Sequence, residues 1–261
     1  MSGFVTMGDG CTLAYRFDGP EQAPILLLSN SLGTDMNMWG PQMAAWTRQF
    51  RVLRYDQRGH GRSAAPDGGY SMDRLGRDVI ELLDALDVGT VDFCGLSLGG
   101  MTGQWIAIRE PARLRKLVLA NTSAFMGPPA NWDARISMVL EQGMAPLAQA
   151  SVERWFTQSF ATSEPEAIAP IAAMLQATDP RGYAGCCAAI RDMDMRRLIR
   201  LIETPTLIIG GSQDPATPPP HSEALARGIR NAELTMVAAA HLSNVELPDL
   251  FAHTVSDFLA S

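Results

Sequence analysis

The chain has 261 residues, of which 46% are hydrophobic and 19% are charged, and this composition fits one large globular domain or one domain that carries an insertion. The net charge of −7 disfavours nucleic acid and anionic membranes as partners, although one arginine in a pocket could still bind a small anion. We see neither a signal peptide nor a membrane-length apolar run, and the four cysteines lack the spacing of a disulfide framework, so we expect a cytoplasmic protein with reduced thiols.

The first half of the chain alternates short apolar runs with amphipathic segments. Four such runs predict strands, at Ile25–Leu28, Val52–Tyr55, Val91–Cys94 and Leu117–Ala120. Between the second and third of these runs, apolar residues recur at helical spacing: Leu75, Val79, Leu82, Leu83 and Leu86. Alternation of strand and helix predicts an α/β fold in which helices flank a mostly parallel central sheet.

The pattern changes between residues 126 and 198, where helical periodicity continues without a convincing strand. The strand and helix pattern then returns, with a strand in TPTLIIGG, a helix near Ser222–Ile229, a strand at Leu234–Val237 and a last helix that begins at Pro248. We therefore predict an all-helical lid, residues 126–198, inserted between two parts of an α/β core, residues 1–125 and 199–261.

The candidate nucleophile is Ser97, in the pattern Gly95-Leu96-Ser97-Leu98-Gly99. The pattern G-x-S-x-G alone is weak, and its serine could merely cap a helix. Here it directly follows a predicted strand and precedes a predicted helix, which is the placement that a nucleophile elbow requires. The flanking glycines let the backbone pass closely through the turn.

A nucleophilic serine needs a base and a group that orients the base. Asp214 follows the strand of LIIGG, and His241 follows the strand at Leu234–Val237. Either residue alone could belong to an ordinary loop. In the chain order serine, acid, histidine, with each residue at a strand end, the three predict a catalytic triad.

The loop SNSLGT, after the first predicted strand, is the candidate oxyanion loop. A serine that attacks an acyl group needs two backbone N–H donors for the oxyanion. One donor belongs to the residue after the nucleophile, here Leu98, and the second comes from this loop, for which we predict Leu32. The alternative is an ordinary polar loop.

The other polar motifs favour structural roles. The segment YDQRGHGRS contains glycines that suit a tight turn after a strand. We expect His60, His221 and His253 to be structural or exposed, and the scattered histidines predict no metal site. Four methionines near the candidate site suggest an apolar pocket or core: Met36, Met38, Met43 and Met101.

Taken together, these motifs resemble the α/β-hydrolase family and, within it, the enol-lactonases of aromatic catabolism. The shared motifs span most of the chain: NSLGT, LRYDQRGHGRS, FCGLSLGG, GQW, TPP, AAHLSNVE and, in the predicted lid, WDARI, RWF and GYAGC. The general family begins its oxyanion loop with His-Gly, whereas this chain has Asn30-Ser31 there. The resemblance implies a hydrolase that opens 3-oxoadipate enol-lactone to 3-oxoadipate, in the β-ketoadipate pathway, without a cofactor.

Recognition of the substrate carboxylate is open at this level. Arg135 follows Trp132 by about one helical turn, so both could face the site, but Arg135 could equally pack over that tryptophan at the surface. Trp155 fits either the pocket wall or the core of the lid. The alternative functions are a carboxylesterase or a C–C bond hydrolase of the same fold, and a small-molecule receptor. A dehalogenase is disfavoured, because it needs a carboxylate where Ser97 stands.

Overall fold

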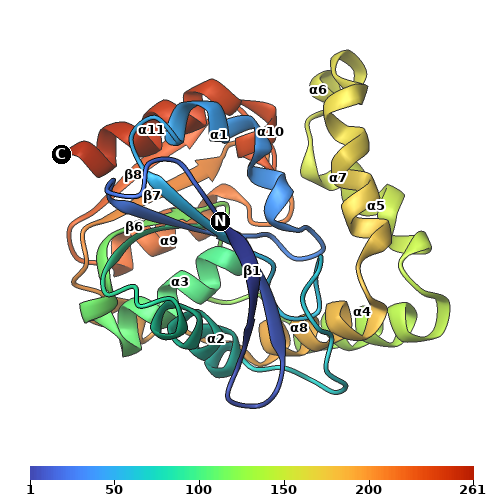
Figure 1. The fold of residues 1–261 in the computed structure, drawn as a ribbon. Coiled ribbons are helices and arrows are strands. Elements are labelled where there is room, and N and C mark those ends of the chain that lie inside the picture. The colour runs from blue at the N-terminus through green and yellow to red at the C-terminus, as the bar shows by residue number, and fades with distance from the viewer.

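The computed structural model describes residues 1–261, except for the side chain of Gln149. Within the described residues, one eight-stranded sheet has the order β1-β2-β4-β3-β5-β6-β7-β8 (Figure 1). The strands are β1 (Ser2–Thr6), β2 (Thr12–Asp18), β3 (Ile25–Ser29), β4 (Arg51–Tyr55), β5 (Val91–Leu96), β6 (Leu114–Ala120), β7 (Thr206–Gly211) and β8 (Ala232–Val237). The pairs β1–β2 and β2–β4 are antiparallel, and the other neighbours are parallel. The prediction of a mostly parallel sheet is confirmed.

The strands predicted in the first half of the chain lie in the middle of the sheet. β5 is buried at every position, and β3 is buried from its second residue onward. Helices cover both faces there, so these strands show no polar alternation. The one charged side chain of β5, Asp92, is paired with Arg115. The sequence analysis missed β1 and β2, whose antiparallel pair lies at the edge of the sheet and exposes alternate residues of β1.

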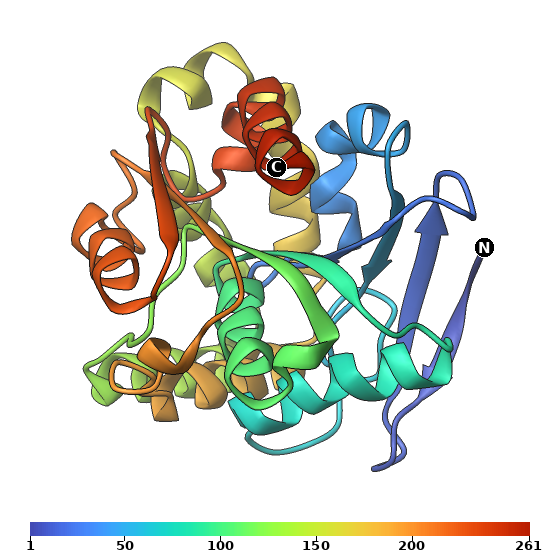
Figure 2. The same cartoon turned by 90° about the vertical axis from the view of Figure 1, so that its left-hand side faces the viewer.

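Helices cover the two faces of the sheet. The helices outside the segment between β6 and β7 are α1 (Gly40–Trp46), α2 (Met72–Ala85), α3 (Leu98–Arg109), α9 (Pro219–Gly228), α10 (Ser243–Glu246) and α11 (Pro248–Ala260). Short 3-10 helices lie at Met36–Trp39, Pro111–Arg113 and Ile199–Leu201. Figure 2 shows α1 (blue) and α11 (red) together on one side, with α2 and α3 (green) on the other.

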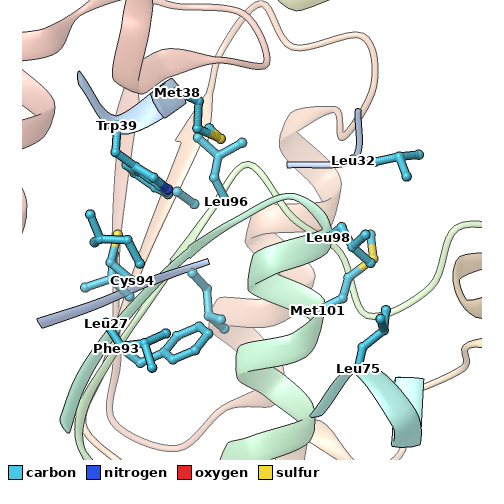
Figure 3. Close-up of a cluster of buried hydrophobic side chains, with 14 of the residues drawn as sticks. Leu27, Leu32, Met38, Trp39, Leu75, Phe93, Cys94, Leu96, Leu98 and Met101 are labelled. Carbon is cyan, nitrogen blue, oxygen red and sulfur yellow. The ribbon is translucent and has the colours of Figure 1, made fainter. Parts of the chain in front are cut away.

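Large buried side chains join these layers to the sheet. On one face, Trp46 donates its ring N–H to the carbonyl of Ala252, 3.2 Å away, which joins α1 to α11. On the other face, a Cβ added to Gly76 of α2 would lie 2.0 Å from the ring of Trp105, so only glycine lets α2 approach α3 this closely. Figure 3 shows Phe93 and other core residues of the central strands beside α3. These contacts join α1 to α11 on one face and α2 to α3 on the other.

The segment between β6 and β7 is helical. It contains α4 (Pro129–Gln142), α5 (Ala145–Trp155), α6 (Gln158–Ser163), α7 (Pro165–Ala177) and α8 (Pro180–Asp192). We call residues 126–198 the helical insertion. An isolated β-bridge between Phe125 and Asp194 brings its two ends together. In Figure 1 these helices extend to one side of the sheet, with α5, α6 and α7 (yellow and green) farthest out. None of the described helices combines the length and apolar composition of a membrane span.

Candidate active site

The turn between β5 and α3 has the backbone of a nucleophile elbow. Ser97 lies between the two elements with φ 57° and ψ −116°, a strained conformation for a residue with a side chain. A Cβ added to Gly99 would lie 2.0 Å from the carbonyl oxygen of Ser29, and one added to Gly95 would lie 2.3 Å from the carbonyl oxygen of Gly99. Both glycines of G-x-S-x-G are therefore required by close backbone contacts, and the turn presents Ser97 at the end of the strand.

The structure brings Ser97, His241 and Asp214 into one hydrogen-bonded chain. Nε2 of His241 lies 3.0 Å from Oγ of Ser97, and Nδ1 of His241 lies 2.8 Å from Oδ2 of Asp214. Asp214 and His241 follow β7 and β8, so parallel strands deliver all three side chains to the same edge of the sheet. With Nδ1 donating to Asp214, Nε2 of neutral His241 is free to accept the serine proton.

The carboxylate of Asp214 is held ionised. Its Oδ1 accepts from the backbone N–H groups of Ala216 at 2.7 Å and Thr217 at 3.0 Å, while Oδ2 accepts from the Thr217 hydroxyl at 2.6 Å. Burial alone would raise the pKa of Asp214, but the charge and hydrogen bond of His241 and the Thr217 donors outweigh it and hold that pKa well below its usual value. Asp214 is therefore the anion that orients His241 at neutral pH.

Asn121, which the sequence analysis did not identify, joins the loop that carries Asp214 to the loop that carries His241. It follows β6 and has φ 43°, a conformation that asparagine tolerates better than most residues. Its Nδ2 donates to Asp214 Oδ2 and to the carbonyl of Ala240, both at 3.0 Å, and its Oδ1 accepts from the Ser243 hydroxyl at 2.6 Å. The available signal was its position: Asn121 ends a strand at the same sheet edge as the triad.

The loop after β3 forms a tight turn at the predicted oxyanion site. Thr34 donates its N–H to the carbonyl of Ser31 at 3.3 Å, and Gly33, at the third position, has φ 78°, as in a type II turn. Leu98 is the first residue of α3. Among the described residues, the N–H groups of Leu32 and Leu98 have no acceptor. These two N–H groups are therefore free to donate to a further acceptor.

A cavity of about 590 Å³, including its open mouth, lies between the sheet edge and the helical insertion. Its lining from the core includes Ser31, Leu32, Ser97, Met101 and His241, and its lining from the insertion includes Trp132, Arg135, Ser151, Arg154, Trp155 and Tyr183. Of the four methionines discussed above, three are buried in the core and Met43 packs against it, while Met101 also lines the cavity.

The insertion residues that the sequence predicted all reach this cavity. The guanidinium of Arg135 lies 5.1 Å above the Trp132 ring and donates to the Tyr183 hydroxyl at 3.4 Å. Arg135 thus packs over the tryptophan and lines the cavity at once, and Trp155 is both buried and part of the wall. The sequence analysis missed Arg154, which also lines the cavity, although RWF was one of the resemblance motifs.

A second cavity adjoins the first. It shares Met126, Trp132, Arg135, Arg154 and Ala216 with the first cavity and adds Asn131, Gly127 and His221. The two arginines therefore line both cavities. Burial lowers the pKa of His221, which favours its neutral form.

The insertion is also bonded directly to the loop that carries His241. Leu242 donates its N–H to the carbonyl of Trp155 at 3.0 Å. The carboxylate of Glu246 accepts from the N–H of Ala240 at 3.0 Å and from the hydroxyl of Thr157. The residues on either side of His241 are thus tied to the end of α5.

The remaining histidines and the cysteines lie outside the hydrogen-bonded chain of Ser97, His241 and Asp214. His60 is buried, and His253 donates Nδ1–H to the carbonyl of Asp249 within α11. The four cysteines are buried free thiols. Among the described residues, no group of three or more His, Cys, Asp or Glu side chains is placed to hold a metal ion.

Comparison with known proteins agrees with this geometry. The family model described as alpha/beta hydrolase fold matches residues 24–248. The chain is 42% identical to 3-oxoadipate enol-lactonase 2 of Acinetobacter baylyi, over 93% of this chain and 91% of that one. The crystal structure of the enol-lactonase from Burkholderia xenovorans LB400 matches with a TM-score of 0.97 and 42% identity, over 99% of this chain and 100% of that one.

A hydrolase structure from Pseudomonas aeruginosa matches equally well, with a TM-score of 0.97 and 48% identity over 100% of this chain and 98% of that one. The resemblance to enol-lactonases that the sequence motifs indicated is confirmed. The chain is a hydrolase that belongs to the alpha/beta hydrolase fold family.

Proposed function

We propose that this enzyme hydrolyses 3-oxoadipate enol-lactone to 3-oxoadipate, with Ser97 as nucleophile, His241 as general base and acid, and Asp214 as the group that orients the histidine. The observation that carries the proposal is the hydrogen-bonded chain from Asp214 Oδ2 through His241 to Ser97 Oγ, at 2.8 and 3.0 Å, which faces a cavity lined by two arginines. The similarity to enol-lactonases supports the choice of substrate.

The first half of the reaction forms an acyl-enzyme. Ser97 attacks the lactone carbonyl as its proton passes to Nε2 of His241, and Asp214 stabilises the imidazolium through Nδ1–H. The carbonyl oxygen becomes an oxyanion, which accepts hydrogen bonds from the N–H groups of Leu32 and Leu98. Collapse of this intermediate breaks the ring C–O bond, and the His241 imidazolium gives its proton to the departing ring oxygen, which leaves as an enol while His241 becomes neutral again.

The second half releases the acid. The enol remains attached to the acyl group, because the lactone is one ring, and it tautomerises to the ketone. A ketone oxygen is a poor nucleophile, so the ring does not close again. Water then attacks the acyl-enzyme while His241 takes its proton, and Ser97 leaves. These steps use only side chains, backbone amides and water.

The helical insertion supplies the second part of the proposal, in which it acts as a lid over the substrate. The lactone carries a free carboxylate, and we assign its recognition to Arg135 and Arg154, with Trp132 and Trp155 as apolar walls. Both guanidiniums line the cavity, and Arg135 also donates to the Tyr183 hydroxyl. A planar guanidinium can bind a substrate carboxylate through two parallel hydrogen bonds.

Replacing Arg135 or Arg154 by alanine is expected to raise KM for the lactone about 10- to 100-fold, because a hydrogen bond to a charged partner contributes about 1.5–3 kcal/mol. Steady-state kinetics on the enol-lactone provides the measurement. The matched control is the same lactone with its carboxylate as a methyl ester, for which both variants should resemble the wild type. Unchanged KM for the free acid in both variants would contradict the assignment.

The direct test of the proposed function follows consumption of the enol-lactone by ultraviolet absorbance, alongside a panel of simple esters. We expect kcat/KM for the lactone to exceed that for every simple ester by at least about 100-fold, since remote binding energy from the carboxylate contributes to catalysis. Fast turnover of simple esters with none of the lactone would favour the carboxylesterase alternative. On this proposal the enzyme acts in the breakdown of aromatic compounds, in the cytoplasm.

A further inference from the structure

The segment YDQRGHGRS packs against the oxyanion turn, a contact between two loops that the mechanism above does not use. The oxyanion turn comprises residues 31–34. The residues of the segment that contact this turn lie in the loop after β4. Gly33 donates its N–H to Nε2 of His60 at 2.9 Å. Gln57 donates Nε2–H to the carbonyl of Ser31 at 3.4 Å. The loop after β4 thus bonds to the peptide on each side of Leu32.

The state of His60 follows from its partners. Its Nδ1 lies 3.2 Å from the carbonyl oxygen of Arg58, which can only accept, so Nδ1 carries the proton. Its Nε2 then holds a lone pair, as acceptance from the N–H of Gly33 requires. Only 1% of the His60 surface is exposed, and burial lowers its pKa to about 4, so the ring is neutral at pH 7.

The bond from Gly33 distinguishes between two orientations of the turn. The positive φ of Gly33, 78°, corresponds to a type II turn, and rotation of the central peptide between Leu32 and Gly33 would convert it to type I. That rotation would replace the Gly33 N–H by the Leu32 carbonyl oxygen in front of His60 Nε2. Two lone pairs would then face each other in a buried place, so neutral His60 favours the observed orientation.

The preceding peptide is fixed from its other end. The carbonyl of Ser31 accepts from the Thr34 hydroxyl at 2.8 Å, from the Thr34 N–H at 3.3 Å and from Gln57. In a trans peptide the C=O and the following N–H point in opposite directions. Because Thr34 and Gln57 hold the Ser31 carbonyl on one side, the N–H of Leu32 points to the opposite side of the turn from these donors.

We propose that His60 is a positioning residue: it holds the Leu32–Gly33 peptide in the type II orientation and so, together with the Thr34 and Gln57 bonds to the Ser31 carbonyl, fixes the turn that presents the Leu32 amide to the developing oxyanion. This inference rests on the proposed function, in which Leu32 is an oxyanion donor. His60 does not contact the substrate in this scheme, because its ring faces Gly33 and Arg58. Its effect should therefore appear in the transition state and leave substrate binding nearly unchanged.

The test compares His60→Gln with His60→Asn. The glutamine amide reaches about as far as Nε2 and can present an acceptor to Gly33, whereas the asparagine amide reaches only the position of Nδ1. Both variants lose the buried ring, so a merely structural role would affect them alike. We expect His60→Asn to lower kcat on the lactone about 10- to 100-fold with KM within about twofold, and His60→Gln to restore most of kcat.

A second readout measures the oxyanion site directly. A trifluoromethyl ketone forms a tetrahedral adduct with the serine, and its affinity should fall in His60→Asn by about the same factor as kcat. Equal kcat in the two variants, or a change confined to KM, would overturn the role of His60. Should His60→Asn fail to fold, His60→Leu takes its place, because leucine fills the buried site but offers Gly33 no acceptor, and kcat and ketone affinity should again fall together.

Failure of this inference is distinguishable from failure of the proposed function. If the enzyme is not an enol-lactonase, the wild type will not consume the lactone, whereas ketone affinity will still report on the turn. If His60 does not position the turn, the wild type will be active and ketone affinity will be the same in both His60 variants.

Discussion

Ser97→Ala is expected to lower kcat on the enol-lactone by about 10⁶-fold. Loss of the triad serine has an effect of this order in other serine hydrolases. The variant cannot form the acyl-enzyme, because no other hydroxyl is hydrogen-bonded to His241 Nε2 among the described residues. Activity is measured with the lactone, and intact-protein mass spectrometry checks for the acyl adduct during turnover.

The folded state should tolerate this change. Alanine has the same Cβ as serine, so the strain of the elbow, at φ 57°, is unchanged. Thermal unfolding and the affinity for 3-oxoadipate serve as controls and should both resemble the wild type. Turnover within about tenfold of the wild-type rate would refute the assignment of Ser97 as nucleophile.

Asp214→Asn is expected to reduce kcat by about 10⁴-fold. Both carboxylate oxygens accept hydrogen bonds, so an amide NH₂ at either position must face a donor or turn toward Nδ1 of His241. In the latter case it donates to Nδ1 and leaves the proton on Nε2, which can no longer take the proton of Ser97. The measurement is kcat on the lactone, with mass spectrometry again reporting the acyl-enzyme.

The same variant should also be less stable, by about 1–3 kcal/mol, because buried donors lose their acceptor. Since the pKa of Asp214 is lowered in the folded state, the carboxylate contributes stability above its ordinary pKa and loses it as the pH falls. The difference in urea unfolding between wild type and Asp214→Asn should accordingly be largest near pH 7 and shrink on acidification. A difference that is constant or grows in acid would contradict the ionised, hydrogen-bonded state of Asp214.

Much of the core can be read from the sequence because its signals are local. The central strands are continuous apolar runs, and α2 has a regular apolar stripe, so their positions follow from periodicity. Ser97, Asp214 and His241 each lie just after a strand, and parallel strands carry such residues to one edge. The glycines beside Ser97 lie in a turn where backbone contacts leave no space for a Cβ.

Other features depend on contacts between distant segments. Nothing in its residue type distinguishes Asn121 from other polar residues of the sequence. Its role becomes visible only in the structure, where its amide donates to Asp214 and to the carbonyl of Ala240. The relation of His60 to Gly33 joins two loops that are 27 residues apart. Arg154 lines the cavity only because α5 packs above the sheet edge. Sequence periodicity does not predict which face of a helix contacts a distant loop. The antiparallel strands β1 and β2 are short segments of mixed polarity, and their alternation of polar and apolar residues is too weak to be distinctive in the sequence.

The bonds from Trp155 and Thr157 to the residues around His241 restrict how substrate can enter. If the end of α5 swung away from the core, Leu242 and Glu246 would lose their partners, and the imidazole would lose its alignment with the serine. If the lactone entered by displacing the end of α5, His241 would therefore lose its alignment as a base in every turnover. Movement of α4, which carries Trp132 and Arg135, leaves these bonds intact. Opening of the site on the α4 side would therefore admit substrate while His241 stays aligned with Ser97.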